Sequence, residues 1–218
     1  MTTTLLPWRV RKVISDRLPL LYHLVANAGT SGNDAAHWDA RLAQTWDARD
    51  WPTKTARIRE LTHPSDAMLD VGCGTGSILR SLQADGYCDL HGMEISNYAI
   101  DRLRREGITM WQGRLPDLPT PDVRFDIVIA SQVLEHIIRR GRFVSEISRV
   151  LKPNGRAFIF VPDDCLGPID ESEHVIKYTS ASLRAFLAKT FDVISIESMR
   201  DANYPMSVLF AQVSRRSL

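Results

Sequence analysis

The sequence predicts an α/β protein with a doubly wound, mostly parallel seven-stranded sheet and a helical cover supplied by its N-terminal residues. From about residue 66, short apolar runs alternate with segments of helical periodicity, as a parallel sheet requires. A glycine-rich turn follows the first apolar run directly. Residues 125–131, FDIVIAS, are almost continuously apolar, which is typical of a strand covered on both faces. The 218 residues suffice for one such domain and are few for two.

Each predicted element has its own local signal. The helix after the second strand begins at Ser96, a residue type that caps helices, and the helix over 142–151 should end at the turn-forming residues 152–155. The last two strands alternate in polarity, and such closing strands can be antiparallel. In chain order the expected elements are a strand over 67–71, a helix over 77–84, a strand over 90–95, the helix capped by Ser96, strands over 108–111 and 125–131, a helix over 142–151, a strand over 157–161, a helix over 180–189, and strands over 191–197 and 207–213.

The first 60 residues stand outside this alternation. We expect residues 1–60 to form a helical lid over the ligand site and residues 61–218 to form the core. The tetrapeptide WDAR occurs at 38–41 and 46–49, which is too short for a repeat architecture. Trp38, Leu42 and Trp46 share one helical face, which is either packed in the protein or borders the ligand pocket.

The extreme N-terminus is basic early and apolar later, but its apolar runs are interrupted well before the roughly 20 residues of a membrane span. The sequence therefore predicts neither a signal peptide nor a transmembrane helix. It favours an amphipathic lid or surface helix, with weak contact to a membrane surface left open.

Composition excludes several classes of function. The net charge of +1 provides no global field that would attract nucleic acid, so a nucleic-acid partner is disfavoured. Three cysteines without paired spacing argue against a disulfide framework or a zinc site and favour a reducing cytoplasm. A homodimer remains open.

The glycine-rich turn lies in residues 68–76, MLDVGCGTG. Its glycines are spaced G-x-G-x-G, whereas a dinucleotide fingerprint reads G-x-G-x-x-G, and the lysine of a P-loop is missing. Asp70 stands two residues before the first glycine, where a carboxylate disfavours a pyrophosphate and favours a cation. Glu94 ends the second strand and can accept both hydroxyls of a ribose. Nicotinamide enzymes use the same device, so Glu94 indicates a nucleoside without showing which one, unless it is simply a solvated acid at a strand end.

Four motifs in this order resemble the class I S-adenosylmethionine-dependent methyltransferases: LDVGCGTG, GMEIS, FDIVIASQVLEHI and LKPNGRAFIFVP. The resemblance covers roughly residues 65–197 and is strongest to the small-molecule branch that includes ubiquinone-type and sugar methyltransferases. It implies a Rossmann-like methyltransferase fold, S-adenosylmethionine as cofactor and S-adenosylhomocysteine as product.

The resemblance also implies roles for particular residues. Glu94 would bind the ribose, Asp70 would orient the turn and the cofactor's ammonium, and Ser131 would line the methyl path. Where the family commonly has Gly-Asp-Ala, this chain has Gly-Arg-Leu at 113–115, so the adenine edge would be read by backbone near Leu115 or by water. The cofactor-binding residues implied in this way are Asp70, Gly72, Cys73, Gly74, Gly76, Glu94, Ile95, Arg114, Leu115, Ser131 and Gln132.

Methyl transfer needs alignment with the methyl group, and a hydroxyl acceptor also needs a base. In related O-methyltransferases, a histidine after the fourth strand and an acid after the fifth sometimes pair, which favours His136 with Asp163. His174 lies in an acid-rich loop and is a third catalytic candidate. Alternatively, His136 only anchors its loop.

The acid-rich loop allows a second interpretation. Its side chains are oxygen-rich ligands suited to Mg²⁺ or Mn²⁺, but exposed acids are commonly just solvated. No metal ligand is therefore assigned, although a divalent metal stays possible. The residues concerned are Asp163, Asp164, Asp170, Glu171 and His174.

The sequence thus predicts a methyltransferase that acts on a small molecule by O-methylation of a sugar or secondary-metabolite hydroxyl. Two alternatives stay open: an RNA or protein methyltransferase, and a non-catalytic subunit that binds the cofactor for regulation. The motifs of DNA amino-group and cytosine-C5 methyltransferases are missing after the fourth strand. The three arginines at 139–142 have no interleaved aromatic residue, which disfavours RNA.

Overall fold

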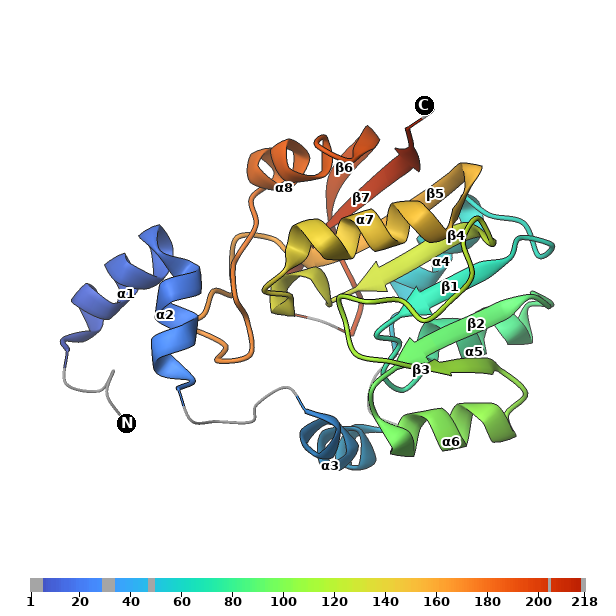
Figure 1. Cartoon of the computed structure of the whole chain (residues 1–218), viewed down its shortest axis with the longest axis horizontal. Coiled ribbons are helices and arrows are strands. Elements are labelled where there is room, and N and C mark those ends of the chain that lie inside the picture. Colours follow the sequence, from blue (N-terminus) through green and yellow to red (C-terminus); the bar gives the residue numbers. More distant parts are fainter. Residues whose placement is uncertain (1–5, 29–33, 47–49, 204, 217–218) are drawn as a thin grey trace.

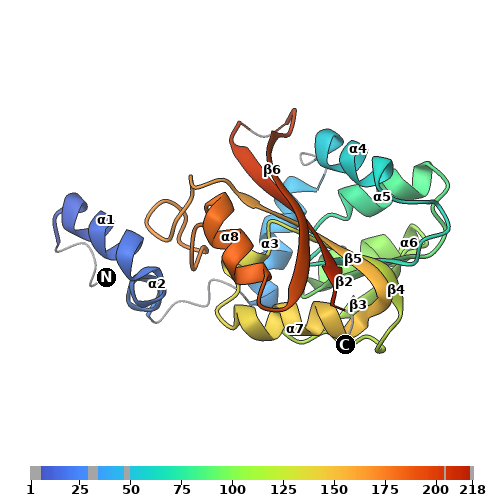
Figure 2. The ribbon, with the colours of Figure 1, turned by 90° about the horizontal axis from the view of Figure 1, so that it is seen from above.

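The computed structural model of the protein describes residues 6–28, 34–46, 50–203 and 205–216. A seven-stranded sheet of order β3-β2-β1-β4-β5-β7-β6 forms the centre, with helices on both of its faces (Figures 1 and 2). The strands β1 to β5 pair in parallel, whereas β7 runs antiparallel to both of its neighbours. The predicted doubly wound, mostly parallel sheet is confirmed.

The bounds of the elements follow the predicted ranges within a few residues, except that β5 begins at Leu151 and not at residue 157. The strands are β1 Met68–Val71, β2 Leu90–Glu94, β3 Thr109–Gln112, β4 Phe125–Ser131, β5 Leu151–Pro162, β6 Phe191–Arg200 and β7 Ser207–Arg215. The helices are α1 Trp8–Arg17, α2 Pro19–Ala26, α3 Ala35–Thr45, α4 Pro52–Glu60, α5 Ser77–Ala84, α6 Asn97–Arg105, α7 Arg140–Val150 and α8 Ser180–Leu187, with a short 3₁₀ helix η2 at Leu134–His136.

The central strand β4 shows how the sheet is buried. Val128 and Ala130 belong to the apolar cluster on one face, and Ile127 and Ile129 belong to the cluster on the other. All four are at most 1% exposed. Because each face is covered by helices, both sets of alternating side chains leave water, at about 1.5–3 kcal/mol for each large aliphatic side chain.

One local prediction is corrected by the strand pairing. Residues 152–155 were expected to form a turn between a helix and a strand, but they lie within β5. Leu151 pairs with Phe125, and the register then shifts so that Arg156 pairs with Ile127. The ladder begins before the turn-forming residues, so they are accommodated as an irregularity in the strand.

The predicted cap at Ser96 is confirmed, and it has a second use. The Ser96 Oγ accepts from the backbone N–H of Ala99 at 3.2 Å, which begins α6. It also donates to Asp39 Oδ1 at 2.6 Å, and that oxygen accepts from the N–H of Tyr98 at 3.1 Å. The start of α6 therefore anchors α3 beside the end of β2.

The N-terminal helices occupy two different environments. In both views α1 and α2 lie away from the sheet, next to the orange loop that follows β5 (Figures 1 and 2). Lys177 Nζ lies 3.3 Å from Asp16 Oδ1, and Asn27 Nδ2 donates to the Ser172 carbonyl at 3.0 Å. The helix α4 instead packs in the core, where Ile58 is fully buried. Within the described residues, none of the helices is long and apolar enough to cross a membrane.

Candidate active site

A cavity of about 750 Å³ lies at the carboxyl ends of β1, β2 and β4. Ligands bind at this edge of doubly wound sheets, and the volume falls in the range of small-molecule sites. Side chains from α2, α3, η2 and the loop 166–174 complete the wall. We call the part lined by the glycine turn and β2 the cofactor end, and the part lined by η2 and this loop the acceptor end.

Asp70 is the most deeply buried acid of the cofactor end, at 2% exposure. Burial, reinforced by the nearby charge of Glu94, raises the pKa of Asp70 to about 8, and Lys54 partly opposes this shift. Its Oδ1 is a buried oxygen without a hydrogen-bond partner among the described residues. A ligand that brings a positive charge or a donor would satisfy this oxygen.

Glu94 is held by backbone amides. Its Oε2 accepts from the N–H of Gly74 at 2.9 Å, and its Oε1 accepts from those of Ile95 at 2.7 Å and Ser96 at 3.2 Å. Burial raises the pKa of Glu94, although these three donors favour the carboxylate. The carboxylate lines the cavity in a fixed orientation, with lone pairs left for a further donor.

The three glycines of the turn have different uses, although all adopt positive φ. A side chain at Gly72 would meet Val133 Cγ2 at 2.8 Å, whereas one at Gly74 would meet only Leu42 at 3.7 Å. Gly76 does not line the cavity: it begins α5, and a side chain there would meet Leu103 at 2.5 Å. The absence of a side chain at Gly76 allows α5 and α6 to pack closely, and its contact with the cofactor stays a prediction.

Ser131 and Gln132 end β4 at the middle of the cavity. Gln132 has a φ of 58°, an unfavourable value for a residue with a side chain, and its buried Nε2 has no hydrogen-bond partner in the described part of the chain. Ser131 Oγ accepts from Lys54 Nζ at 3.2 Å. Lys54 is fully buried, and its ammonium lies 3.5 Å from the centre of the Trp51 ring. Nothing in the sequence pattern pointed to Lys54.

The remaining predicted cofactor residues also line the cavity: Cys73, Ile95, Arg114 and Leu115. Burial raises the pKa of the Cys73 thiol well above its usual value, so it stays protonated and acts as a small apolar group. Arg114 is exposed at the rim. Their contacts with a cofactor remain predictions.

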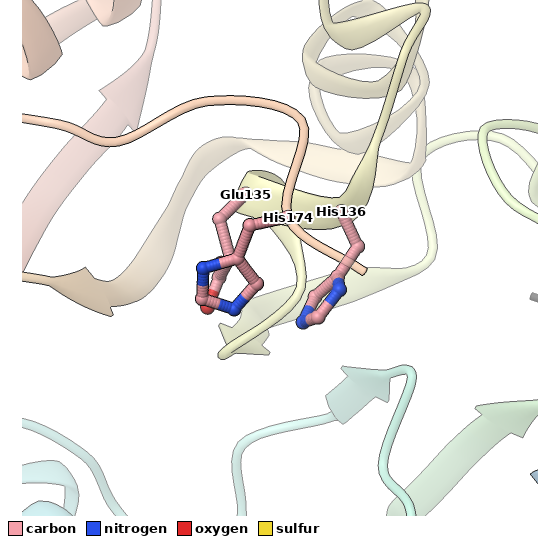
Figure 3. Close-up of side chains that lie close together, drawn as sticks. All are labelled: Glu135, His136 and His174. Atoms are coloured by element: carbon pink, nitrogen blue, oxygen red, sulfur yellow. The ribbon is translucent and has the colours of Figure 1, made fainter. Parts of the chain in front are cut away.

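The acceptor end brings Glu135, His136 and His174 together, although η2 and the loop are far apart in sequence (Figure 3). One possible ligand atom from each residue lies within 4.8 Å of those of the other two. The two imidazole rings meet edge to face, with centroids 4.7 Å apart. The ring of Trp38, on α3, lies 6.2 Å from that of His136.

Burial controls the protonation of these three groups. It lowers the pKa of His136 to about 3, with a further contribution from His174, and it lowers the pKa of His174. It raises the pKa of Glu135 to about 8, and both Glu135 oxygens are without hydrogen-bond partners among the residues described. Both imidazoles are therefore neutral near pH 7, and each can accept a proton or bind a cation.

The predicted pairing of His136 with Asp163 is not formed. His136 Nδ1 donates to the Glu173 carbonyl at 3.1 Å, and Asp163 Oδ2 accepts from Ser198 Oγ at 2.5 Å. Asp163 does not line the cavity. The reason is the direction of the chain after β5: Asp163 bridges to Tyr178 and faces β6, so its carboxylate is aimed away from η2.

The acid-rich loop is also arranged differently from the oxygen-rich metal site that we considered. Asp170 caps its own loop by accepting from the Gly167 N–H at 2.9 Å, and Asp164 is exposed with its Oδ1 3.4 Å from Lys177 Nζ. Within the described residues, His174 groups with Glu135 and His136 instead.

Several wall residues were missed from the sequence. Glu173 pairs with Arg41 and accepts from His37 Nε2 at 2.8 Å, which fastens the loop to α3. Trp38 and Leu42 line the cavity, whereas Trp46 lies in the core. The helical face that these residues share is therefore partly packed in the protein and partly in contact with the cavity. Glu135 was adjacent to a chosen residue, and Arg41 lay on the helix whose Trp38 face had the ligand pocket as one of its two interpretations, but no pattern indicated a cavity contact for Glu135, Arg41 or Glu173.

Comparison with known proteins supports the family predicted from the motifs. Residues 69–159 match a family profile described as a methyltransferase domain. The chain is 34% identical over 134 residues to a demethylmenaquinone methyltransferase of Symbiobacterium thermophilum, covering 56% of this chain and 53% of that protein. It is 28% identical over 137 residues to the 27-O-demethylrifamycin SV methyltransferase of Amycolatopsis mediterranei, covering 51% and 50%. The chain thus spans about half the length of these curated relatives.

Solved structures agree on the fold. The 1,6-didemethyltoxoflavin-N1-methyltransferase of Burkholderia thailandensis, which has S-adenosylhomocysteine bound, is similar with a TM-score of 0.68 at 16% identity, over 84% of this chain and 85% of that one. The family profile and the curated relatives thus support a methyltransferase domain of the S-adenosylmethionine-dependent class over residues 69–159, and the solved structure supports its fold.

Proposed function

We propose, for a chain whose residues 69–159 form a class I S-adenosylmethionine-dependent methyltransferase domain, that the methyl acceptor is the hydroxyl of a small molecule such as a sugar or a secondary metabolite. One observation carries this proposal: the same cavity is lined by the cofactor-end acids and by two neutral imidazoles, the half-buried His136 and the buried His174. A hydroxyl acceptor needs such groups, because it is unreactive while protonated, whereas a neutral amine does not.

The residues of the cofactor end fit S-adenosylmethionine. The unpartnered Asp70 Oδ1 suits a cationic group, Glu94 suits a pair of hydroxyls, and the missing side chain at Gly72 leaves room for close approach to the backbone. When bound, the cofactor supplies a methyl group on a positively charged sulfur. The protein must then hold the acceptor in line and exclude water.

The acceptor end would handle the hydroxyl proton. The Nδ1 atoms of His136 and His174 donate to backbone carbonyls, so the Nε2 lone pairs are available to the cavity. The hydroxyl proton passes to one Nε2. The acceptor oxygen could then bond to the methyl carbon, while the sulfur of the cofactor would keep the electron pair of the carbon–sulfur bond that breaks. Asp163 has no part in this scheme.

The covered entrance supports a small acceptor over a polymer. The loop that carries His174 is fastened to α3 through Glu173 and Arg41, and Trp38 packs near His136 behind it. An RNA strand or a folded protein would need this loop to open. The O-methylation indicated by the name of the rifamycin relative is consistent with a hydroxyl acceptor, although that name describes the relative alone.

The α1–α2 pair supports a related proposal, that it contacts an anionic membrane surface. The exposed apolar side chains on this pair and next to it are Leu6, Trp8, Val10, Val13, Leu18, Leu20, Leu21, Leu24 and Val25. The α1 sequence, WRVRKVISDR, has four basic residues and one acid, which complements negative lipid. Sedimentation with anionic vesicles, but not with neutral ones, would support this contact, and Val13→Asp should weaken it. The cytoplasmic location and the homodimer stay predictions.

The test of the main proposal is a transfer assay with methyl-labelled S-adenosylmethionine and a fractionated extract of the source organism. Label in a small polar or lipid-linked fraction, present there as a methyl ether, supports the proposed O-methylation. Label in RNA or protein would overturn the acceptor class. If the chain retains S-adenosylhomocysteine but labels nothing, the non-catalytic regulatory subunit becomes the better account.

A further inference from the structure

We propose that Glu135, His136 and His174 form a binding site for one divalent transition-metal ion of the zinc class at the acceptor end of the cavity. The site differs from the oxygen-rich loop considered from the sequence, with which it shares only His174. Two imidazoles and one carboxylate form a ligand set that binds zinc in hydrolytic enzymes and leaves positions open for a substrate.

The first observation is convergence. A ligand atom of each residue lies within 4.8 Å of the other two, and the side chains point toward one another (Figure 3). A tetrahedral ion at 2.0–2.1 Å from each ligand would place these atoms about 3.3 Å apart. Small side-chain rotations therefore close the site without moving η2 or the loop.

The second observation is the orientation of the two rings. His136 Nδ1 donates to the Glu173 carbonyl at 3.1 Å, and His174 Nδ1 donates to the Leu166 carbonyl at 2.9 Å. Metal-binding histidines commonly donate their second ring nitrogen to a carbonyl in this way, which fixes the tautomer and leaves Nε2 as the ligand. Two independent rings are thus prepared as ligands toward the same cavity.

The third observation is the unsatisfied carboxyl of Glu135. The side chain is 1% exposed, and neither oxygen has a hydrogen-bond partner within the described part of the chain. Burying a carboxyl without hydrogen-bond partners costs free energy, and a cation bound beside it would offset that cost. The positive charge of Arg41, which also lies near His136, is offset by its ion pair with Glu173.

The ligand types decide the class of ion. Mg²⁺ and Ca²⁺ prefer sites built from oxygen, whereas imidazole nitrogen favours Zn²⁺ and its transition-metal neighbours. Of the oxygen ligands of the loop, Asp170 accepts from its own backbone and Asp164 lies beside Lys177, whereas Glu171 lines the cavity near His174 but is not one of the three grouped residues. The geometry therefore favours a nitrogen-rich transition-metal site over a magnesium site.

The ion refines the proposed function and rests on it for its role. A hydroxyl bound to the ion is acidified, so its proton can leave to water and its oxygen can then take the methyl group. In that case the two imidazoles act as ligands and not as bases. Metal binding itself is independent of this role and can be measured without any acceptor.

The experiment uses the untagged full chain, freed of metal by a chelator. Calorimetry with Zn²⁺ should give one site per chain with a dissociation constant in the micromolar range or below. The Co²⁺-loaded chain should show the visible absorption of a four- or five-coordinate ion with nitrogen ligands. His174→Ala should weaken Zn²⁺ binding by more than about a hundredfold and Glu135→Gln by more than about tenfold, since each removes one ligand.

Two matched variants serve as controls. His63→Ala removes an exposed histidine, and Asp164→Asn removes an acid of the loop. Both should bind Zn²⁺ like the wild type. Failure of the wild-type chain to bind Zn²⁺, or equal loss in Asp164→Asn, would overturn the proposed site. Circular dichroism of His174→Ala and Glu135→Gln must match the wild type, and Glu135→Asp should retain part of the affinity if the carboxylate is a ligand.

The transfer assay separates this inference from the proposed function. A chain that binds no Zn²⁺ but methylates a hydroxyl in the presence of chelator would leave the proposed function intact and exclude the metal site. A chain that binds one Zn²⁺ through these residues but labels no small molecule would keep the metal site and contradict the proposed acceptor.

Discussion

The two ends of the cavity are built in different ways. At the cofactor end the functional groups stand directly at the ends of strands. Glu94 accepts hydrogen bonds from three backbone N–H groups, one in the glycine turn and two just after β2. At the acceptor end the wall comes from α2, α3, η2 and the loop 166–174, which contact one another mainly through side chains. Backbone geometry fixes the first end, whereas side-chain packing fixes the second.

Substitutions at the two ends of the cavity should therefore have different effects. A change at the cofactor end should alter the turn or the affinity for the cofactor, because ligand groups and backbone are coupled there. A change at the acceptor end should alter turnover while leaving the cofactor in place. Loops that carry side-chain sites on a rigid scaffold can also vary without unfolding the sheet.

The largest expected effect is at the acceptor end. His136→Ala should lower kcat by about a hundredfold, because the hydroxyl loses either its proton acceptor or a ligand of its ion. Affinity for S-adenosylhomocysteine, measured by calorimetry, should change less than about twofold. His63→Ala, at an exposed histidine, is the control. Parallel loss of cofactor affinity and turnover would show that the two ends are not separable.

The next effect tests the backbone of the cofactor end. Gly72→Ala combines a left-handed φ of 68° with a contact of 2.8 Å to Val133, so the free energy of unfolding should fall by about 2 kcal/mol or more. Gly86→Ala has a φ of 87° with nothing within 4 Å and isolates the backbone cost alone. Urea unfolding of both variants gives the comparison. Equal losses would mean that close packing under the turn is unimportant.

Glu94→Ala should weaken binding of S-adenosylhomocysteine by more than tenfold, or about 1.4 kcal/mol. The variant loses the acceptor for the ribose and leaves the N–H groups of Gly74, Ile95 and Ser96 without their partner. Calorimetry of Glu60→Ala, at an exposed acid, provides the reference. Unchanged affinity in the Glu94 variant would contradict the placement of the ribose.

A smaller effect should follow pH. Burial raises the pKa of Asp70 to about 8 in the folded chain, where Glu94, Lys54 and the Cys73 thiol are its charged or titratable neighbours. Between about pH 4 and 8, the native state keeps a proton on Asp70 that the unfolded chain has released. The free energy of unfolding is therefore higher at low pH, and this contribution is lost as the pH rises toward 8. Between pH 5 and 8, the wild type should lose about 1 kcal/mol or more of unfolding free energy relative to Asp70→Asn.

Urea unfolding of both chains without cofactor, at several pH values, measures this difference. Cofactor binding should reverse the shift, because a cationic group beside Asp70 favours its carboxylate. Calorimetry of S-adenosylhomocysteine binding in two buffers of different ionisation enthalpy should therefore detect proton release at pH 7. Parallel stability curves for the two chains would contradict a protonated Asp70.

The smallest effect is expected at Asp163. Its carboxylate accepts from Ser198 outside the cavity, so Asp163→Asn should change kcat less than threefold. Steady-state kinetics beside His136→Ala tests this directly. A loss as large as that of the histidine variant would restore the pairing expected from the sequence.

The sequence by itself determined the sheet, its order of elements and most of the cofactor end. The apolar run of β4, the cap at Ser96, the glycines beside Asp70 and the acid at Glu94 act on neighbours within a few residues, so local pattern suffices to place them. The conformation of these features depends on backbone geometry, which is determined by residues close together in sequence.

Only the tertiary structure decided the acceptor end. It brought Glu135 and His136 beside His174, nearly 40 residues further along the chain, buried Lys54 beside Ser131, and turned Asp163 toward Ser198. It also placed Gly76 against Leu103 of α6, a packing contact that the glycine spacing does not indicate. These contacts join segments with no common periodicity. Their positions depend on how helices and loops pack over the sheet, which no local pattern specifies.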